Sequence, residues 1–190
     1  MSIIERLHKK RFILRDIKPS NIAVGFGERA KFFYIQDLFH AKKYWDPVQQ
    51  VHIPYREGKD FRSNPRFAST SAHLGIELSR RDDLEMISYT LLYLLKKSLP
   101  WDKQAVTGNA GNRYEGVLLK KIEPSDDLFE GFPYEFSVML KYAKSLRFEE
   151  KPDYAWLGNN FRELFKKLDL RLDHNYDWNR LQVIFLSIKK

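Results

Sequence analysis

Cysteine is absent from this chain of 190 residues, and histidine is sparse. Without cysteine the protein has neither a disulfide framework nor a thiolate metal site, and its five histidines show no spacing typical of metal ligands. We therefore expect no structural metal centre. Stability must come from a hydrophobic core, for which the composition suffices: 43% of the residues are apolar and 15% aromatic, as in a globular protein of one domain.

Long hydrophobic runs are also missing. The longest one, residues 91–95, is far shorter than the roughly 20 apolar residues that span a bilayer. The start of the chain lacks the apolar stretch and cleavage site of a secretion signal. We expect a soluble intracellular protein of the cytoplasm or nucleus, with no membrane partner.

Charge is unbalanced towards the positive side. There are 33 lysines and arginines against 25 aspartates and glutamates, and the resulting net charge of +8 favours nucleic acid, anionic lipid, or acidic and phosphorylated protein as partners. The basic residues come as scattered pairs, which is typical of solvated faces, so a nucleic-acid-binding domain explains only the charge. The pairs are Lys9-Lys10, Lys42-Lys43, Arg80-Arg81, Lys96-Lys97, Lys120-Lys121 and Lys166-Lys167.

Apolar spacing predicts a mainly α-helical fold with one small β-hairpin. Helices are expected over residues 2–12, 82–97, 113–122, 134–145 and 154–168. The helix at 82–97 is apolar around most of its circumference, which predicts that it is buried. Short β-like runs at 22–24 and 32–35 flank a turn with two glycines and predict the hairpin. We expect one domain over residues 1–180 and a C-terminal tail at 181–190.

The stretch that carries chemistry is the string LRDIKPSN at residues 14–21, together with Asp37 after the second predicted strand. Asp16 offers a carboxylate that can accept a hydroxyl proton, and Lys18 offers a cation for a moving phosphate. Asn21 begins the predicted hairpin and Asp37 follows it, so their oxygens come close enough to share one Mg²⁺. The alternatives are ordinary loop chemistry around a proline, and a strand-end cap at Asp37.

These residues resemble the catalytic loop and metal-binding segment of eukaryotic protein kinases, and further strings resemble the casein kinase 1 family. The resemblance spans about residues 6–179. It implies the large C-terminal lobe of a kinase that uses ATP and Mg²⁺ to phosphorylate Ser or Thr in acidic or phosphorylated protein segments. The strings are AKKY (41–44), HIPYRE (52–57), RFAS (66–69), HLGIE (73–77), SRRDDLE (79–85), SLPW (98–101), SLRF (145–148) and KPDY (151–154).

The resemblance also implies roles for single residues. Asp16 would orient the substrate hydroxyl and accept its proton, Lys18 would stabilise the transferring phosphoryl group, and Asn21 with Asp37 would ligate Mg²⁺. Asp83 would support the backbone of the catalytic loop. The alternative for Asp83 is an acidic residue in the first turn of a helix, where the helix dipole favours it.

Basic side chains near the cleft would read the anion of the substrate. Arginine suits phosphate through paired hydrogen bonds, and lysine acts as a point charge. The alternatives are solubility and local ion pairs. Two sets match family positions: Arg66 with Arg113 and the nearby Lys103, and Arg15 with Lys42 and Lys59.

Two residues depart from the kinase pattern. Leu14 replaces the usual His, which performs no proton chemistry. Phe39 replaces the usual Gly of the metal segment, and because an aromatic residue restricts the backbone, we expect that segment to be altered.

The β-rich small lobe that carries a Gly-rich loop and a Lys–Glu pair does not precede these residues. We expect it to come from a longer chain or from a partner, and the apolar surface that meets it to face water here. The isolated chain is accordingly expected to be a weak or inactive enzyme. The rival interpretation is a catalytically dead relative that binds phosphorylated or acidic protein segments.

Overall fold

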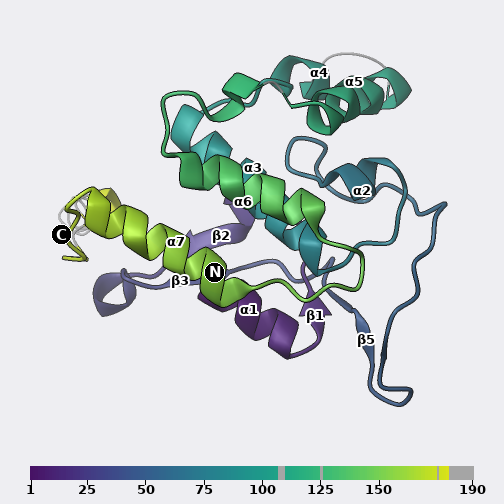
Figure 1. Cartoon of the computed structure of the whole chain (residues 1–190), viewed down its shortest axis with the longest axis horizontal. Helices are drawn as coiled ribbons and strands as arrows, with labels where there is room; N and C mark the ends of the chain where they lie inside the picture. The colour runs from purple at the N-terminus through teal and green to yellow at the C-terminus, as the bar shows by residue number, and fades with distance from the viewer. Residues whose placement is uncertain (107–109, 125, 175, 180–190) are drawn as a thin grey trace, which may run out of the picture.

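The computed structural model describes residues 1–106, 110–124, 126–174 and 176–179, and its fold is mainly helical (Figure 1). The helices are α1 (Ser2–Lys9), α2 (Thr70–His73), α3 (Arg80–Lys96), α4 (Asp102–Val106), α5 (Ala110–Ile122), α6 (Tyr134–Ser145) and α7 (Tyr154–Lys167). The strands are β1 (Phe12–Ile13), β2 (Ile22–Val24), β3 (Phe33–Ile35), β4 (Lys42–Lys43), β5 (Trp45–Asp46) and β6 (Val51–His52). The predicted boundary at residue 180 and the tail at 181–190 lie outside these residues. None of the helices in the described ranges is long and apolar enough to cross a membrane.

Helix α3 is the centre of the fold, as predicted for the apolar helix at 82–97. The backbone N–H of Ser79 donates to Asp82 Oδ2 over 2.8 Å at its start, and Lys97 adopts a left-handed conformation (φ 61°) at its end. Leu84, Met86 and Leu92 are all fully buried along the helix. Figure 1 shows α6 crossing in front of α3, with α4 and α5 at one end of the molecule and α1 at the other.

Three hydrophobic clusters meet on α3. Met86 belongs to a cluster with α1, β1 and the loop that contains Leu14. Tyr89 and Leu92 pack in a second cluster with residues of α4, α5 and α6. Leu84 belongs to a third, with α6 and α7. The helix is therefore a rigid support beneath residues 14–21, and substitutions in it act on the loop above through packing.

The predicted hairpin is confirmed. Strands β2 and β3 pair antiparallel, with Ile22 opposite Ile35 and Val24 opposite Phe33. The other strand pairs, β1 with β4 and β5 with β6, are two-residue ladders. An apolar surface faces water on the hairpin and on the segment after it: Val24, Phe26, Phe32, Phe33, Tyr34, Leu38 and Phe39 are all exposed. That a small lobe covers this surface stays a prediction.

Scattered basic pairs are typical of solvated faces, but two of the six pairs each contain one buried cation. Arg80 is buried, with its guanidinium 4.7 Å from the ring centroid of Tyr44, and it donates to the carbonyl of Glu149. Lys121 is fully buried, whereas its neighbour Lys120 is exposed. Both buried cations lie where ring faces and backbone carbonyls replace water as their partners.

Candidate active site

The backbone of the loop at residues 14–21 is anchored from below by Asp83. This fully buried carboxylate accepts hydrogen bonds from the N–H groups of Leu14 (2.7 Å) and Arg15 (2.9 Å), and it lies 2.9 Å from His8 Nε2. Arg15 takes a left-handed conformation with φ of 66° at this point. Such a conformation is costly for a non-glycine residue and persists where the surroundings fix it, so Asp83 holds a strained loop in place.

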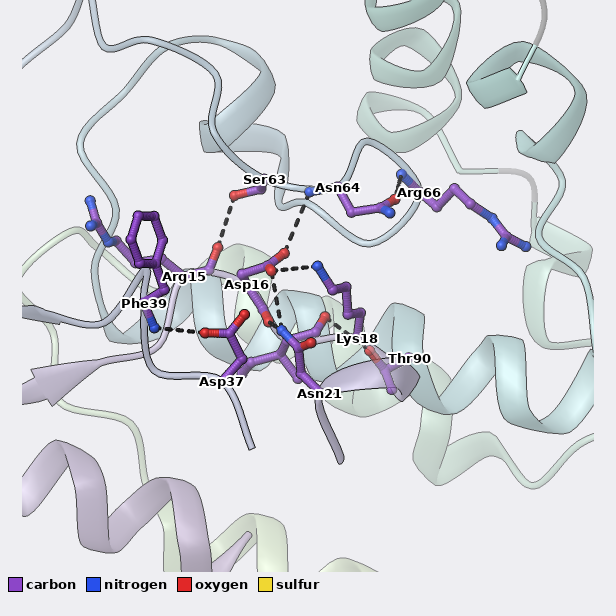
Figure 2. A network of polar contacts seen from close by, with 11 residues as sticks. Arg15, Asp16, Lys18, Asn21, Asp37, Phe39, Ser63, Asn64, Arg66 and Thr90 are labelled. Carbon is purple, nitrogen blue, oxygen red and sulfur yellow. Dashed lines mark hydrogen bonds and ion pairs between the residues drawn. The ribbon is translucent and has the colours of Figure 1, made fainter. Parts of the chain in front are cut away.

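Asp16, Lys18 and Asn21 form one cluster at the surface of the loop. Asp16 is mostly buried, and its Oδ2 accepts from Lys18 Nζ (2.6 Å) and from Asn21 Nδ2 (3.1 Å). The same Asn21 amide nitrogen donates to the Asp16 carbonyl over 3.0 Å. Figure 2 shows the three side chains converging, with Asn64 approaching Asp16 from the opposite side. Asp16, Lys18 and Asn21, which lie close together in the sequence, therefore also form one cluster in space.

Asn21 and Asp37 lie at the same end of the hairpin. The N–H of Gln36 donates to the carbonyl of Asn21 over 3.0 Å, which places Asp37 one residue away from this pair (Figure 2). Among the described residues, the hydrogen bonds of the Asn21 side chain use only its nitrogen, so its carbonyl oxygen could serve as a ligand. Asp37 Oδ1 accepts from the Phe39 N–H (2.8 Å), and its Oδ2 accepts no hydrogen bond from the part of the chain that the structure describes.

This donor set fits Mg²⁺. The ion prefers oxygen ligands and is often held by one or two protein side chains together with substrate phosphates and water. Within the described parts of the chain, no group of three His, Asp or Glu side chains could hold a metal by itself. A loaded site would therefore depend on nucleotide phosphates as well as on Asn21 and Asp37.

Phe39 does not adopt a left-handed backbone, so its Cβ imposes no strain of that kind. Its ring is 86% exposed and meets the ring of His40 edge-on at 5.2 Å between centroids. The segment instead forms a local turn in which the Asp37 carboxylate binds the backbone two residues on. One oxygen of the predicted metal ligand is thereby shared with the turn.

In the first predicted anion-binding set, Arg66 is engaged internally. Arg66 binds Asp102 at the start of α4 through two parallel hydrogen bonds, Nε–Oδ1 at 2.8 Å and Nη2–Oδ2 at 2.7 Å, and its guanidinium lies 4.8 Å from the ring centroid of Tyr93. Lys103 is exposed beside Asp102. Arg113 lies on α5, and its side chain is outside the described part of the structure. A substrate anion at Arg66 would have to compete with Asp102.

Replacing Asp102 by Asn is expected to lower the free energy of unfolding by about 1 kcal/mol at neutral pH. Burial raises the pKa of Asp102, but hydrogen bonds from Arg66 and from the Leu99 N–H outweigh it and hold the pKa below the usual 3.8. Between the folded and the unfolded pKa of Asp102, the unfolded chain therefore binds more protons than the folded one. The stabilisation is present above the unfolded pKa and is lost as pH falls through the folded pKa. Urea unfolding of both proteins should show the difference shrinking below about pH 4, and a difference unchanged by acid would contradict this origin.

The second predicted set converges on one cavity of about 450 Å³. Arg15, Lys42, Lys59 and Arg62 line it together with two carboxylates, the buried Glu77 and the exposed Asp60, which pairs with Arg62. Glu77 Oε1 is 2.9 Å from Lys42 Nζ, and its Oε2 is 3.4 Å from Lys59 Nζ. Burial raises the pKa of Glu77, but the two ammonium groups outweigh it and lower the pKa below its ordinary value. Positive charge exceeds negative in this hollow, which suits an anion.

Several contacts of the site were not predicted from the sequence. His8 on α1 is buried between Asp83 and the hydroxyl of Tyr154, Thr90 Oγ1 donates to the Ile17 carbonyl (3.2 Å), and Ser63 Oγ donates to the Arg15 carbonyl (2.8 Å). The only signal in the sequence for any of these contacts was the position of His8 on the inner side of an amphipathic helix. The partners lie 48 to 146 residues apart in sequence, so nothing local could pair them.

The sequence was also compared with models of known protein families, and no family model matches it. The functional assignment therefore rests on the geometry of the cluster around Asp16 and on the resemblance of the sequence strings.

Proposed function

We propose that this chain is the large lobe of a casein kinase 1-like protein kinase, which transfers the γ-phosphate of ATP to Ser or Thr in acidic or phosphorylated protein segments. One observation carries the proposal: Lys18 Nζ and Asn21 Nδ2 both bind Asp16 Oδ2, at 2.6 and 3.1 Å, on a loop fixed by Asp83. A buried carboxylate, a lysine and a metal-ligating amide in one cluster are the parts that phosphoryl transfer needs.

In this proposal each residue acts on a defined atom. Asp16 Oδ2 orients the attacking hydroxyl and takes its proton, and Lys18 turns from Asp16 to the transferring phosphoryl group. Asn21 and Asp37 would hold Mg²⁺, which supplies positive charge to the phosphates when bound. A small lobe would complete the nucleotide cleft by covering the hairpin. The exposed aromatic side chains of the hairpin support this arrangement, because an apolar surface of this kind is typical of a contact with another protein segment.

The test is phosphate transfer by the full chain from radiolabelled Mg-ATP to casein, an acidic phosphoprotein. We expect label on Ser and Thr of casein that disappears when EDTA removes Mg²⁺. Because the small lobe contributes to nucleotide binding, transfer is also measured after adding a separately produced kinase small lobe. Absence of transfer in both assays, with correct folding shown by circular dichroism, would contradict the kinase proposal.

The basic cavity favours a second candidate function, a module that binds phosphorylated or acidic protein segments without catalysis. Its support is the grouping of Arg15, Lys42, Lys59 and Arg62 around one hollow large enough for a phosphate group. Binding of a phosphoserine peptide without any phosphate transfer would favour this function. Neither binding nor transfer would contradict both.

Replacing Glu77 by Gln is expected to tighten phosphoserine-peptide binding about tenfold, equivalent to about 1.4 kcal/mol. The substitution removes a buried negative charge that lies among the basic residues of the cavity and that would repel the incoming phosphate. Isothermal titration calorimetry at fixed salt measures the affinity. The matched control is Glu163→Gln on α7, an exposed residue that should leave it unchanged. Weaker binding by E77Q would mean that Glu77 mainly orients the two lysines.

A further inference from the structure

Lys121 is the most deeply buried cation of the described residues. It lies near the end of α5 with an exposed fraction of 0%. Its Nζ donates to the carbonyls of Pro65 (2.8 Å) and Ala68 (2.6 Å), and it lies 3.3 Å from His73 Nε2. A buried ammonium is costly unless such partners replace its water, so these contacts are a built environment for it.

Aromatic rings complete this environment. Lys121 Nζ lies 4.8 Å from the ring centroid of Tyr89 and 5.1 Å from that of Trp101, within the range of cation–π attraction. Among the described residues, no carboxylate comes within 4.0 Å of Nζ to form an ion pair. The charge is therefore compensated mainly by carbonyl dipoles and ring faces.

The carbonyls that Lys121 binds belong to the segment that reaches Asp16. The Asn64 N–H lies 3.5 Å from Asp16 Oδ1, and the Arg66 carbonyl accepts from Trp101 Nε1 (2.8 Å). The carbonyls of residues 65, 66 and 68 are thus all bound by buried groups on its inner side. Lys121 supplies two of these contacts, and His73 Nε2 lies 3.2 Å from the Pro65 carbonyl as a further one. These contacts leave the segment little freedom.

We propose that the Lys121 ammonium is a positioning residue that sets the conformation of residues 64–68 beside Asp16. The inner side of this segment depends on Lys121, and its outer side approaches the proposed catalytic carboxylate. The consequence for substrate binding rests on the proposed function. The conformational statement does not, because it concerns contacts within this chain only.

The charge state of Lys121 gives the proposal a measurable signature. Burial lowers its pKa from 10.5 to about 7; Glu85 opposes this effect and Lys144 adds to it. Its other titratable neighbours are Tyr89, whose pKa burial raises well above 10, and His73, whose pKa burial and the Lys121 charge lower to about 3. Neither of these two groups changes charge near neutral pH, so neither accounts for a transition there.

One nearby group titrates close to this range. Burial raises the pKa of Asp82 to about 6, and this residue accepts a hydrogen bond from Ser69 Oγ (2.8 Å), next to the segment. A variant that removes Lys121 alone separates the two. Lys121→Met keeps an unbranched apolar stem as far as Cε while deleting the amine, and Asp82 is untouched.

The test is a pH titration of the full chain by NMR, with carbon-13 in lysine and nitrogen-15 in the backbone. We expect the Lys121 Cε signal and the amide signals of residues 64 and 66–68 to shift together, with a midpoint near pH 7. The amide transition should be absent in Lys121→Met and retained in Lys120→Met, since Lys120 binds only the Pro100 carbonyl among described partners. Amide signals that do not move in the wild type between about pH 6 and pH 9 would overturn the proposal.

Persistence of the amide transition in Lys121→Met would equally overturn it and assign the transition to Asp82. Should Lys121→Met fail to fold, the wild-type titration decides alone, because coincident midpoints of the Lys121 Cε and segment amides are required. A lysine signal with a midpoint near 10.5 would contradict the inference. None of these readouts uses phosphate transfer, so a failure of the proposed kinase function leaves them unaffected.

Discussion

Replacing Asp83 by Ala is expected to lower the free energy of unfolding by about 3–5 kcal/mol. Asp83 is fully buried and receives the backbone N–H groups of Leu14 and Arg15 together with His8 Nε2. Alanine would leave two backbone donors and a histidine buried without their acceptor, and it would add a cavity. The strained backbone at Arg15 (φ 66°) would also lose its restraint.

Urea unfolding monitored by circular dichroism measures this loss. The matched control is Asp60→Ala, because the Asp60 side chain is 79% exposed and pairs only with Arg62 of the described residues; its effect should stay within about 0.5 kcal/mol. Asp83→Asn tests the role of the charge and should fall between the two, since it keeps one acceptor oxygen. A loss below about 1 kcal/mol for Asp83→Ala would show that the loop does not depend on this residue.

Local elements were predictable from the sequence because their signals are local. The stripe of Phe136, Met139, Leu140 and Ala143 gave the bounds of α6 correctly, since helical spacing of apolar residues depends only on neighbours. The hairpin followed from two β-like runs around a glycine turn, with β3 beginning at Phe33. The helix expected from residue 113 begins earlier, at Ala110, in a stretch whose glycine and asparagines favour loops.

Contacts between distant segments were not predictable from the sequence. Residue type alone suggests an exposed position for a lysine or an arginine, and this is wrong where a distant segment covers the side chain. Lys121 was expected on a solvated face, yet it is buried under the segment at 64–68. Arg66 was expected to meet a substrate anion, and the structure gives it Asp102 as a partner 36 residues away. Asp83 could be placed under the loop at residues 14–21 only through the resemblance to kinase sequences, since its partners are 68 to 75 residues distant.

Replacing Asp16 by Asn is expected to reduce phosphate transfer to casein by about 10²–10⁴-fold at saturating Mg-ATP. Asparagine keeps the size of the side chain and one acceptor oxygen but cannot take a proton from the attacking hydroxyl. It also removes the charge that binds Lys18 over 2.6 Å. The stability of the variant should change by no more than about 1 kcal/mol, because asparagine keeps an acceptor oxygen and Lys18, whose side chain is partly exposed, can be solvated by water instead. The assay compares it with wild type and with Glu163→Gln, which changes an exposed carboxylate on α7 outside both the cluster and the basic cavity.

Asp37→Asn separates proton chemistry from metal binding. Asp37 already shares one oxygen with the Phe39 N–H, so loss of its charge should weaken Mg-ATP binding and raise the Mg²⁺ concentration needed for transfer. Asp16→Asn should leave Mg-ATP binding near the wild-type value while transfer falls. Equal transfer by Asp16→Asn and wild type would remove the proton acceptor from the proposal. If both variants lost only nucleotide binding, both carboxylates would act in metal binding. Asp16 would then have no separate role as the proton acceptor.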